Sequence, residues 1–357
     1  MKPFSDKGTV DSSENNPPIN HFEYWPPYLF HLPSICFYII LAFRYRSLTL
    51  PTVANPGFPD SKCAILDRVP PDFKQWVARY KLFRRPGDNS RRAKAAQYII
   101  NEFGIDYPLV VKPDLGLKGI GIERLNNFQD LKSYLIRTRG TGALQFQEYI
   151  DWPGEAGVFY IRRPGADRGN IVSLAFKSPV TVTGDGQSTL ENLIMANKRT
   201  RRIRHIVMRH NRHQLTMVVP KGETVPLTFA LNHTQGGVFS NACHLLTDAL
   251  QNRFDDIAQA MPDFYYGRFD VKFEKLDTFV KGQRFKIIEI NGALAEPIHY
   301  FDAEARLRDV YRHYFSCLRA LFVISDFNRR QGHRPAPFKQ FMTEQLNLIK
   351  FIADNSK

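Results

Sequence analysis

Two segments in the last third of the chain alternate polar and apolar residues: GRFDVKFE at 267–274 and KIIEINGA at 286–293. Neighbouring side chains of a β-strand point to opposite faces, so this period of two predicts two strands. Arg268, Asp270 and Lys272 then share one face of the first strand, and Glu289 and Asn291 share one face of the second. The opposite faces are apolar and are expected to pack on a core; they carry Phe269, Val271, Phe273, Ile288 and Ile290.

The polar face of these two strands brings oxygen ligands and a cation together. Asp270, Glu289 and Asn291 offer carboxylate and carboxamide oxygens, which suit Mg²⁺ because this ion keeps water and substrate phosphates as its other ligands. Arg268 beside them is suited to stabilise charge on a phosphoryl group in transfer. A solvated sheet surface would show the same alternation, so that alternative stays open.

A glycine-rich turn follows the apolar run that Lys112 ends. Gly116, Gly119 and Gly121 come next. Glycines let backbone amides approach an anion closely, and the lysine adds a positive charge. No GK[ST] ends the loop, and a strand-like run follows where a dinucleotide fingerprint needs a helix, so neither motif fits. The pattern predicts a β-hairpin that either binds phosphate or is a simple turn.

Two further segments are suited to the rest of a nucleotide. FQEYI at 146–150 is typical of a strand that leads into an open segment, whose backbone groups can meet a purine edge. Glu155 in PGEAGVF is suited to accept both ribose hydroxyls. An ordinary strand and a surface glutamate are the alternative.

The ordered segments VVKPDLGLKGIGI, FQEYI, PGEAGVF, AFKSP, GRFDVKFE and IIEINGA together resemble the ATP-grasp superfamily, over residues 90–325. The similarity is to D-alanine–D-alanine ligase and to the ligase region of cyanophycin synthetase. The opening of the chain is similar to that of a bacterial group of ATP-grasp proteins that share Glu-Tyr/Phe-Trp-Pro. The resemblance implies an α+β fold in which two lobes clasp ATP, with Mg²⁺ or Mn²⁺ as the metal.

The resemblance also implies roles for the residues that match. Lys112 and Lys177 in AFKSP match the two lysines that contact the nucleotide phosphates, and Arg268 matches the arginine that steadies the transferred phosphoryl group. The hairpin over the phosphates carries Gly116, Gly119 and Gly121. The adenine and ribose contacts match Glu148, Tyr149, Ile150 and Glu155. The magnesium ligands match Asp270, Glu289 and Asn291.

The segment after these metal residues departs from D-alanine ligases. It reads GALAEPIHYFD where a Ser-Pro-Gly-like turn is the family pattern, so we expect a different acceptor. Glu296, His299, Tyr300 and Asp302 are the substrate-side candidates. A turn followed by a helix capped near Asp302 is the alternative.

The resemblance implies a ligase that joins a small-molecule carboxylate to an amine or a related nucleophile, with ATP and through an acyl phosphate. A carboxylate is a poor electrophile and must be phosphorylated first, and the cations offset the charge repulsion in that step. A carboxylate kinase and an ATP-binding module without turnover remain as alternatives. The sequence identifies neither the carboxylate, nor the nucleophile, nor the oligomeric state.

The chain divides into five segments by composition. Residues 1–20 are polar and predict a disordered tail, 21–60 are aromatic and apolar, and 61–89 are expected to be a connection. The resemblance implies an ATP-grasp domain over 90–325, and 326–357 are expected to form a C-terminal extension. Hairpins and helices in mixed order favour α+β over a doubly wound parallel sheet.

The apolar run 28–43 is too short and too interrupted for a spanning helix. Residues 24–46 are expected either to contact a membrane peripherally or to dock as an internal helix on the enzyme. Four scattered cysteines without paired spacing predict that the protein lies in a reducing cytoplasm. It is expected there either free in solution or associated with the inner face of the membrane.

The net charge of +14 favours anionic partners. The basic segment 198–213 could bind nucleic acid, but no stacking motif accompanies it, so we expect no nucleic-acid partner. A solvated helix or the wall of an anionic substrate site is the alternative.

Overall fold

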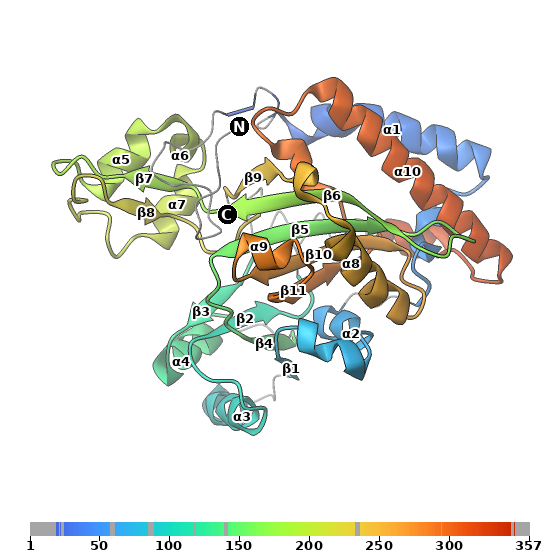
Figure 1. Cartoon of the computed structure of the whole chain (residues 1–357). Coiled ribbons are helices and arrows are strands. Elements are labelled where there is room, and N and C mark those ends of the chain that lie inside the picture. The colour runs from blue at the N-terminus through green and yellow to red at the C-terminus, as the bar shows by residue number, and fades with distance from the viewer. Residues whose placement is uncertain are drawn as a thin grey trace.

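The structure is a computed structural model that describes residues 19–20, 22, 25–57, 61–84, 89–116, 119–138, 142–232, 236–293, 295–343 and 346. The tail expected at 1–20 lies outside these ranges except for its last two residues, and so does most of the extension beyond 343. Two antiparallel sheets with helices packed on them form the two main lobes (Figure 1). The predicted α+β class is confirmed.

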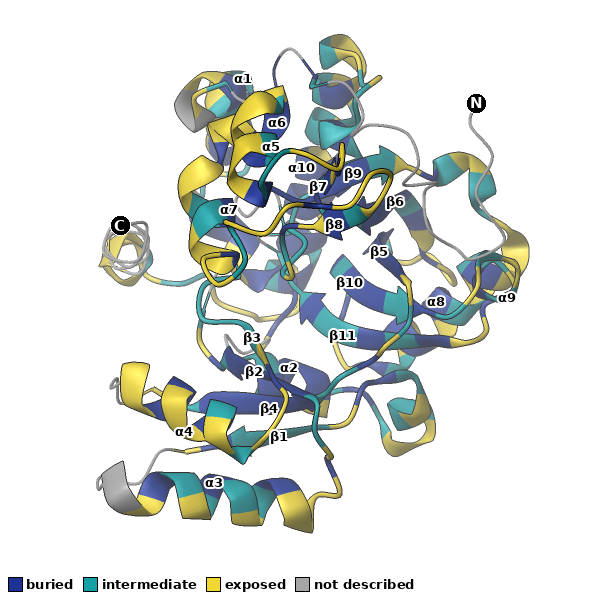
Figure 2. Ribbon diagram, turned by 90° about the vertical axis from the view of Figure 1, so that its left-hand side faces the viewer, coloured by how far each residue is buried: buried dark blue, intermediate teal, exposed yellow. Residues whose placement is uncertain are grey.

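The small lobe is a four-stranded sheet in the order β1-β4-β2-β3. Its strands are β1 (Tyr80–Phe83), β2 (Leu109–Pro113), β3 (Glu123–Leu125) and β4 (Leu144–Glu148). β2 and β3 pair antiparallel, which confirms the hairpin predicted around the glycines. Helices α3 (Asn89–Glu102) and α4 (Phe128–Arg137) pack on it, with their exposed faces outward (Figure 2). Asn127 caps α4 through a bond from the Asp130 N–H.

The large lobe is a five-stranded antiparallel sheet in the order β11-β10-β5-β6-β9. Its strands are β5 (Gly154–Ile161), β6 (Asn170–Ser178), β9 (Val238–Asn241), β10 (Tyr266–Phe273) and β11 (Phe285–Asn291). Both faces of the sheet are covered. Val158 and Tyr160 pack toward α8 (Asp248–Ala260), whereas Phe159 and Ile161 pack toward α10 (Leu307–Arg330). This is why every residue of β5 is buried.

Helix α1 (Pro27–Arg44) lies along the outer side of α10 (Figure 1). Phe37 contacts Phe315, with ring centroids 4.7 Å apart, and Tyr38 contacts Phe322 at 5.1 Å. The segment 28–43 is therefore a helix docked on the enzyme, as one of the two alternatives predicted. No helix in the described part of the chain is long and apolar enough to span a membrane.

A third, smaller unit contains β7 (Thr181–Thr183), β8 (Thr224–Pro226) and the basic segment. Three short helices lie between these strands: α5 (Leu190–Ala196), α6 (Lys198–Arg202) and α7 (Arg204–His210). The break between α5 and α6 lies at Asn197, whose side chain accepts from the N–H groups of Arg199 and Thr200 and so begins a new helix.

Residues 61–89 are more than the connection expected. They form α2 (Lys62–Asp67), the 3-10 helix η2 (Pro71–Trp76) and β1, which is an edge strand of the small sheet. Short elements complete the fold: η1 (Leu50–Val53), η4 (Cys243–Leu245), α9 (Leu276–Phe279) and η5 (Ile298–Phe301). Helix α10 continues to Arg330, so the expected boundary at 325 falls within it.

Candidate active site

The polar faces of β10 and β11 face one another as the sequence predicted. Asp270 pairs with Glu289, and Arg268 pairs with Asn291. The alternation of β11 is interrupted, however, because Val271 pairs with Ile287 and leaves Ile288 as the extra residue of a bulge. Ile287 and Ile290 therefore lie in the core, and the expectation that Ile288 does so is wrong.

Asp270 is the buried centre of the site. Its Oδ1 lies 2.8 Å from Arg268 Nε and 3.1 Å from Lys177 Nζ, and its Oδ2 accepts from Arg268 Nη2 at 3.1 Å. Asn291 Nδ2 also donates to Oδ2, at 3.2 Å. Burial alone would raise the pKa of Asp270, but Arg268 and Lys177 outweigh it and lower this pKa to about 2. The carboxylate is thus ionised and able to hold cations.

Lys177 on β6 connects Asp270 to a second carboxylate. Its Nζ lies 3.3 Å from Glu155 Oε1, and Lys272 Nζ lies 3.4 Å from Glu155 Oε2. Glu155 is buried, with 8% exposure. Its carboxylate thus holds two lysines in this structure, and its expected contact with ribose stays a prediction.

Lys112 crosses from the small lobe to the large one. It lies on β2, and its Nζ donates to the backbone oxygen of Ile288 at 3.1 Å, as does Gln147 Nε2. Ile288 is the bulged residue of β11, and its carbonyl oxygen accepts hydrogen bonds from the small lobe. Burial lowers the pKa of Lys112, while Glu289 raises it. The predicted phosphate lysine and the predicted metal residues are therefore brought together.

Lys62 is a site residue that the sequence did not indicate. It is the first residue of α2; its Nζ lies 3.4 Å from Glu289 Oε1 and donates to the backbone oxygen of Gly116 at 2.6 Å. It thus joins the glycine hairpin to the second strand of the site. The cations of this cluster outnumber its carboxylates: Lys62, Lys112, Lys177, Arg268 and Lys272 against Glu155, Asp270 and Glu289.

The hairpin glycines have the conformations that a close loop needs. Gly119 and Gly121 have φ of +72° and +75°, where other residues are strained. A Cβ on Gly119 would come 2.3 Å from Asn232 Nδ2. The segment around 230–232 therefore packs against this turn.

The adenine candidates follow β4 at the edge between the lobes. Glu148 accepts from the Arg79 N–H at 3.0 Å, and Ile150 is buried. The ring of Tyr149 lies under the guanidinium of Arg124, 4.3 Å from its centroid. Their contact with adenine stays a prediction.

Glu296 is the substrate-side candidate in contact with the cluster. Its backbone oxygen accepts from Arg268 Nη1 at 3.0 Å, and its Oε1 accepts from Tyr314 at 2.6 Å. His31 Nδ1 lies 3.9 Å from the same Oε1. Its carboxylate is therefore fixed beside the arginine.

His299 lies in a buried hydrogen-bonded chain. Nδ1 is 2.6 Å from Ser173 Oγ, and Nε2 is 3.1 Å from His313 Nδ1. Burial, and then His313, lowers the pKa of His299 to about 3, and burial lowers that of His313 as well. Both rings are neutral near pH 7.

The other two candidates have structural roles. Tyr300 is 0% exposed and packs in a core with Phe22, Phe30 and Val310, which corrects its expected role at the substrate. Asp302 accepts from the N–H groups of Asn241 and Glu304, both at 2.7 Å, and so fixes a turn. Helix α10 begins later, at Leu307, so Asp302 does not cap it.

The donor set suits a cation that shares its shell with phosphates. Asp270 and Glu289 are directly opposite one another on adjacent strands, and Asn291 contacts Asp270. The described residues include no group of three or more His, Cys, Asp or Glu able to hold a metal by themselves. One or two carboxylates are what Mg²⁺ takes from a protein when a nucleotide supplies further oxygens, so the residues fit this ion.

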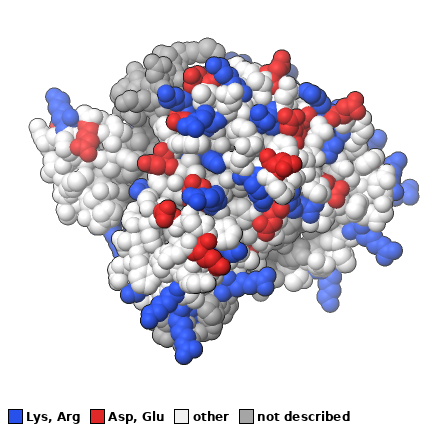
Figure 3. Space-filling view, turned by 60° about the horizontal axis from the view of Figure 1, so that its bottom comes forward, with Lys and Arg blue, Asp and Glu red and all other residues white. Residues whose placement is uncertain are grey.

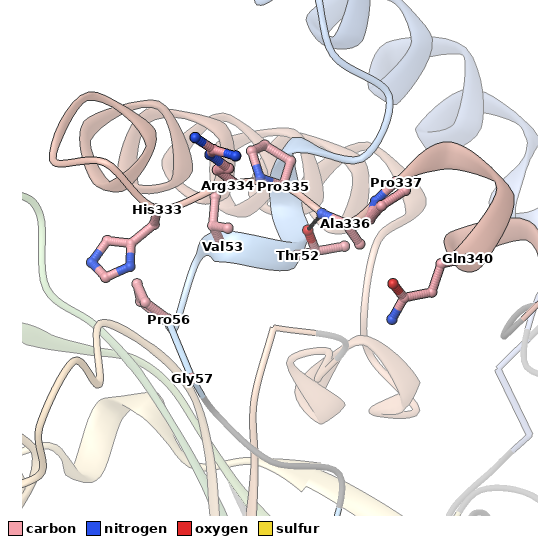
Figure 4. A pocket seen from close by; sticks show the side chains of 10 residues that line it. All are labelled: Thr52, Val53, Pro56, Gly57, His333, Arg334, Pro335, Ala336, Pro337 and Gln340. Atoms are coloured by element: carbon pink, nitrogen blue, oxygen red, sulfur yellow. Dashed lines mark hydrogen bonds between the residues drawn. The ribbon is translucent and has the colours of Figure 1, made fainter.

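A pocket of about 450 Å³ lies elsewhere, between η1 and residues 333–337 (Figure 4). Ala336 N–H donates to Thr52 Oγ1 across it, at 3.0 Å. None of the predicted site residues lines this pocket. We therefore assign it no part in the chemistry of the cluster.

The basic segment shows mostly exposed side chains, which fits a solvated surface. Arg199 is an exception, with 4% exposure. On the face shown in Figure 3, acidic and basic side chains are interspersed over the centre. The absence of a nucleic-acid partner stays a prediction.

Comparison with known proteins finds similarity among solved structures. No protein-family model and no curated protein sequence matches the chain. The structures include a bifunctional glutathione synthetase from Pasteurella multocida, with 16% identity, a TM-score of 0.39, and coverage of 71% of this chain and 36% of that one. The VanG D-Ala:D-Ser ligase from Enterococcus faecalis has 13% identity, a TM-score of 0.42, and coverage of 78% and 64%. The D-alanine–D-alanine ligase from Bacillus anthracis has 12% identity, a TM-score of 0.44, and coverage of 78% and 70%.

The chain spans 36% of the length of the glutathione synthetase that it matches. At these identities and TM-scores, the ATP-grasp resemblance of the sequence stays a prediction.

Proposed function

We propose that this protein is an ATP-dependent ligase of the ATP-grasp type that joins a carboxylate to an amine through an acyl phosphate. One observation carries the proposal. Lys112 of the small lobe donates to a backbone oxygen of the bulged strand β11, and on the adjacent strand β10 Asp270 is paired with Arg268 and Lys177. Cations from both lobes thus converge on a pair of carboxylates. Such a cluster is suited to a triphosphate with its metal.

The cations stabilise the negative charge of the phosphates during the reaction. Lys62 and Lys112 lie at the hairpin side and are positioned for the outer phosphate oxygens. Arg268 lies between Asp270 and the backbone of Glu296, where the phosphoryl group would meet the substrate. Because these groups are gathered in one cluster before the substrate arrives, they would need only to exchange ion-pair partners to stabilise the charge that develops.

The reaction has two steps. A carboxylate oxygen attacks the γ-phosphorus, the bond to ADP breaks, and an acyl phosphate forms. The amine then attacks the acyl carbon, inorganic phosphate leaves, and the amine loses a proton. The Glu296 carboxylate, which accepts a hydrogen bond from Tyr314, would take one proton from the ammonium form of the amine before the free amine attacks.

Asp270, Glu289 and Asn291 would hold the divalent cation. The bound cation would neutralise phosphate charge when it is present. The chain's own contribution is to orient these oxygens by strand pairing, at Asp270 opposite Glu289.

The test measures ADP, acyl phosphate and condensed product separately. The purified chain is given ATP, Mg²⁺ and panels of amino acids and short peptides as carboxylates and amines. The proposal predicts ADP release that needs both substrates, together with an amide product identified by mass.

Hydroxylamine separates the alternatives because it traps an acyl phosphate as a hydroxamate. Hydroxamate without any amide product would indicate a carboxylate kinase. ATP binding without ADP release for any pair in the panel would favour a binding module and contradict the proposal.

A further inference from the structure

Helix α1 exposes an apolar face along its whole length. The exposed side chains recur at helical spacing and carry no charge: Leu29, Leu32, Ile35, Cys36, Ile39, Ile40 and Phe43. Ile40 is 61% exposed and Phe43 is 81% exposed. An unbroken apolar stripe of this kind marks a surface that meets an apolar phase.

The opposite face of α1 packs on the protein and holds the helix in position, so the stripe is not needed for this. Leu41 and Ala42 are buried in the core beneath it, and Phe37 and Tyr38 pack on α10. The tyrosine also donates to the backbone oxygen of Leu48 at 2.5 Å. The helix is therefore anchored by one side, and the exposed stripe contributes little to holding it.

Charges around the stripe are positive. No Asp or Glu occurs between Tyr24 and Pro59, whereas Arg44 and Arg46 are exposed at the end of α1. On α10, Phe315 touches Phe37, and Arg312 and Arg319 are one turn away from it on the same side. Asp309 is the acidic neighbour there, and it is paired with Arg312 at 2.9 Å.

A second copy of the chain is a poor match for this face. A helix of 18 residues is about 27 Å long and about 10 Å wide. Two such stripes would bury about 540 Å² together, well under the roughly 1,200 Å² of a stable interface.

We propose that α1 docks the enzyme on an anionic lipid surface, with the apolar stripe at the boundary of the acyl chains. A helix that lies in the plane of the lipid–water interface buries its apolar face about 5–10 Å deep. In this orientation every residue of the stripe contacts lipid. Arg44, Arg46 and Arg319 then meet lipid phosphates. The active site stays in water, since its residues lie on the strands of the large sheet and on the small lobe.

The test is sedimentation of the full chain with two kinds of vesicle. One is phosphatidylcholine alone, and the other contains about 30% of the anionic lipid phosphatidylglycerol. We expect binding to the anionic vesicles to be about 125-fold stronger than to neutral ones, since each of the three arginines contributes about fivefold. Ile40→Asp with Phe43→Asp is expected to weaken binding at least tenfold. Ile136→Asp is the matched control, because Ile136 is also 61% exposed but lies on α4.

Charge is tested by Arg44→Gln with Arg46→Gln, against Arg201→Gln with Arg204→Gln, which has the same net charge. A polarity-sensitive dye on Cys36, which is exposed within the stripe, reads insertion without altering the helix. No blue shift with anionic vesicles, or equal binding by the α1 variants and their controls, would overturn the proposal. A dimer in sedimentation velocity that Ile40→Asp with Phe43→Asp dissociates would identify a second copy as the occupant instead.

Discussion

Replacing Lys112 by Met separates the cost of a buried charge from the benefit of binding a phosphate. Lys112 is 4% exposed, and its Nζ donates to the backbone oxygen of Ile288. The substitution removes a hydrogen bond worth about 1 kcal/mol but also the desolvation penalty of an ammonium group. Met has nearly the same length and fills the same space. We therefore expect the free energy of unfolding without nucleotide to change by no more than about 1 kcal/mol.

Nucleotide binding should respond quite differently. A charged donor on a phosphate oxygen contributes about 2 kcal/mol, so the dissociation constant for ATP should rise about 30-fold. At an ATP concentration of about 100 times the wild-type dissociation constant, bound ligand stabilises the wild type by about 2.7 kcal/mol. The variant at the same concentration should gain only about 0.9 kcal/mol.

Urea unfolding with and without Mg²⁺ and ATP measures both quantities on the same samples. Lys94→Met is the control, since Lys94 is exposed on α3 and should leave both values unchanged. An ATP-induced stabilisation of the Lys112→Met variant equal to that of the wild type would refute the assignment of this lysine to the phosphates.

Three further predictions concern the same cluster and its neighbour. Arg268→Ala should lower turnover at least 10²-fold while the ATP dissociation constant changes little, because the arginine acts on the transferred group; unchanged ADP release would exclude that role. Chelation of divalent cations should weaken ATP binding at least tenfold in calorimetry, because Asp270 and Glu289 then remain as negative charges near the phosphates; equal affinity with and without Mg²⁺ would contradict the metal site. The pKa of His299 is lowered to about 3 in the folded protein, so its neutral form stabilises the fold above the ordinary value near 6.5 and this stability is lost as the pH falls from there toward 3. Guanidinium unfolding between pH 7 and 4 should show this loss, up to about 1.4 kcal/mol per pH unit, and His299→Gln should reduce the slope, whereas an identical slope would assign the acid sensitivity to other groups.

The sequence predicted strands β10 and β11 because their polar and apolar residues alternate as the pleat of a strand requires. Alternation placed Arg268 and Asp270 on one face and Glu289 on the facing strand, and the structure pairs them. It could not predict the bulge at Ile288, because a bulge changes the register by one residue without changing the local composition. The hydrogen bond from Lys112 to the backbone oxygen of Ile288 could not be predicted for the same reason.

Residues brought in by tertiary packing were also beyond the sequence. Lys62 follows a Pro/Gly-rich stretch, and nothing in its neighbours distinguishes it from a surface lysine. The helix break at Asn197 had a local signal, since Asn is a good N-cap. Tyr300 looked like a substrate contact because it follows the motif in the chain, yet η5 turns its ring into the core.

The ion pairs of the site account for the expected link between ATP and the metal. Asp270 now holds Arg268 and Lys177, and Glu289 holds Lys62. A triphosphate needs those cations, and leaving the carboxylates unpaired and partly buried would cost several kcal/mol by the usual penalty for such groups. A divalent cation held by Asp270 and Glu289 would remove that cost, since the phosphates could then take over the lysines and the arginine. Each group would keep a partner of opposite charge, which accounts for cations from β2, β6 and α2 lying beside the oxygen ligands of β10 and β11.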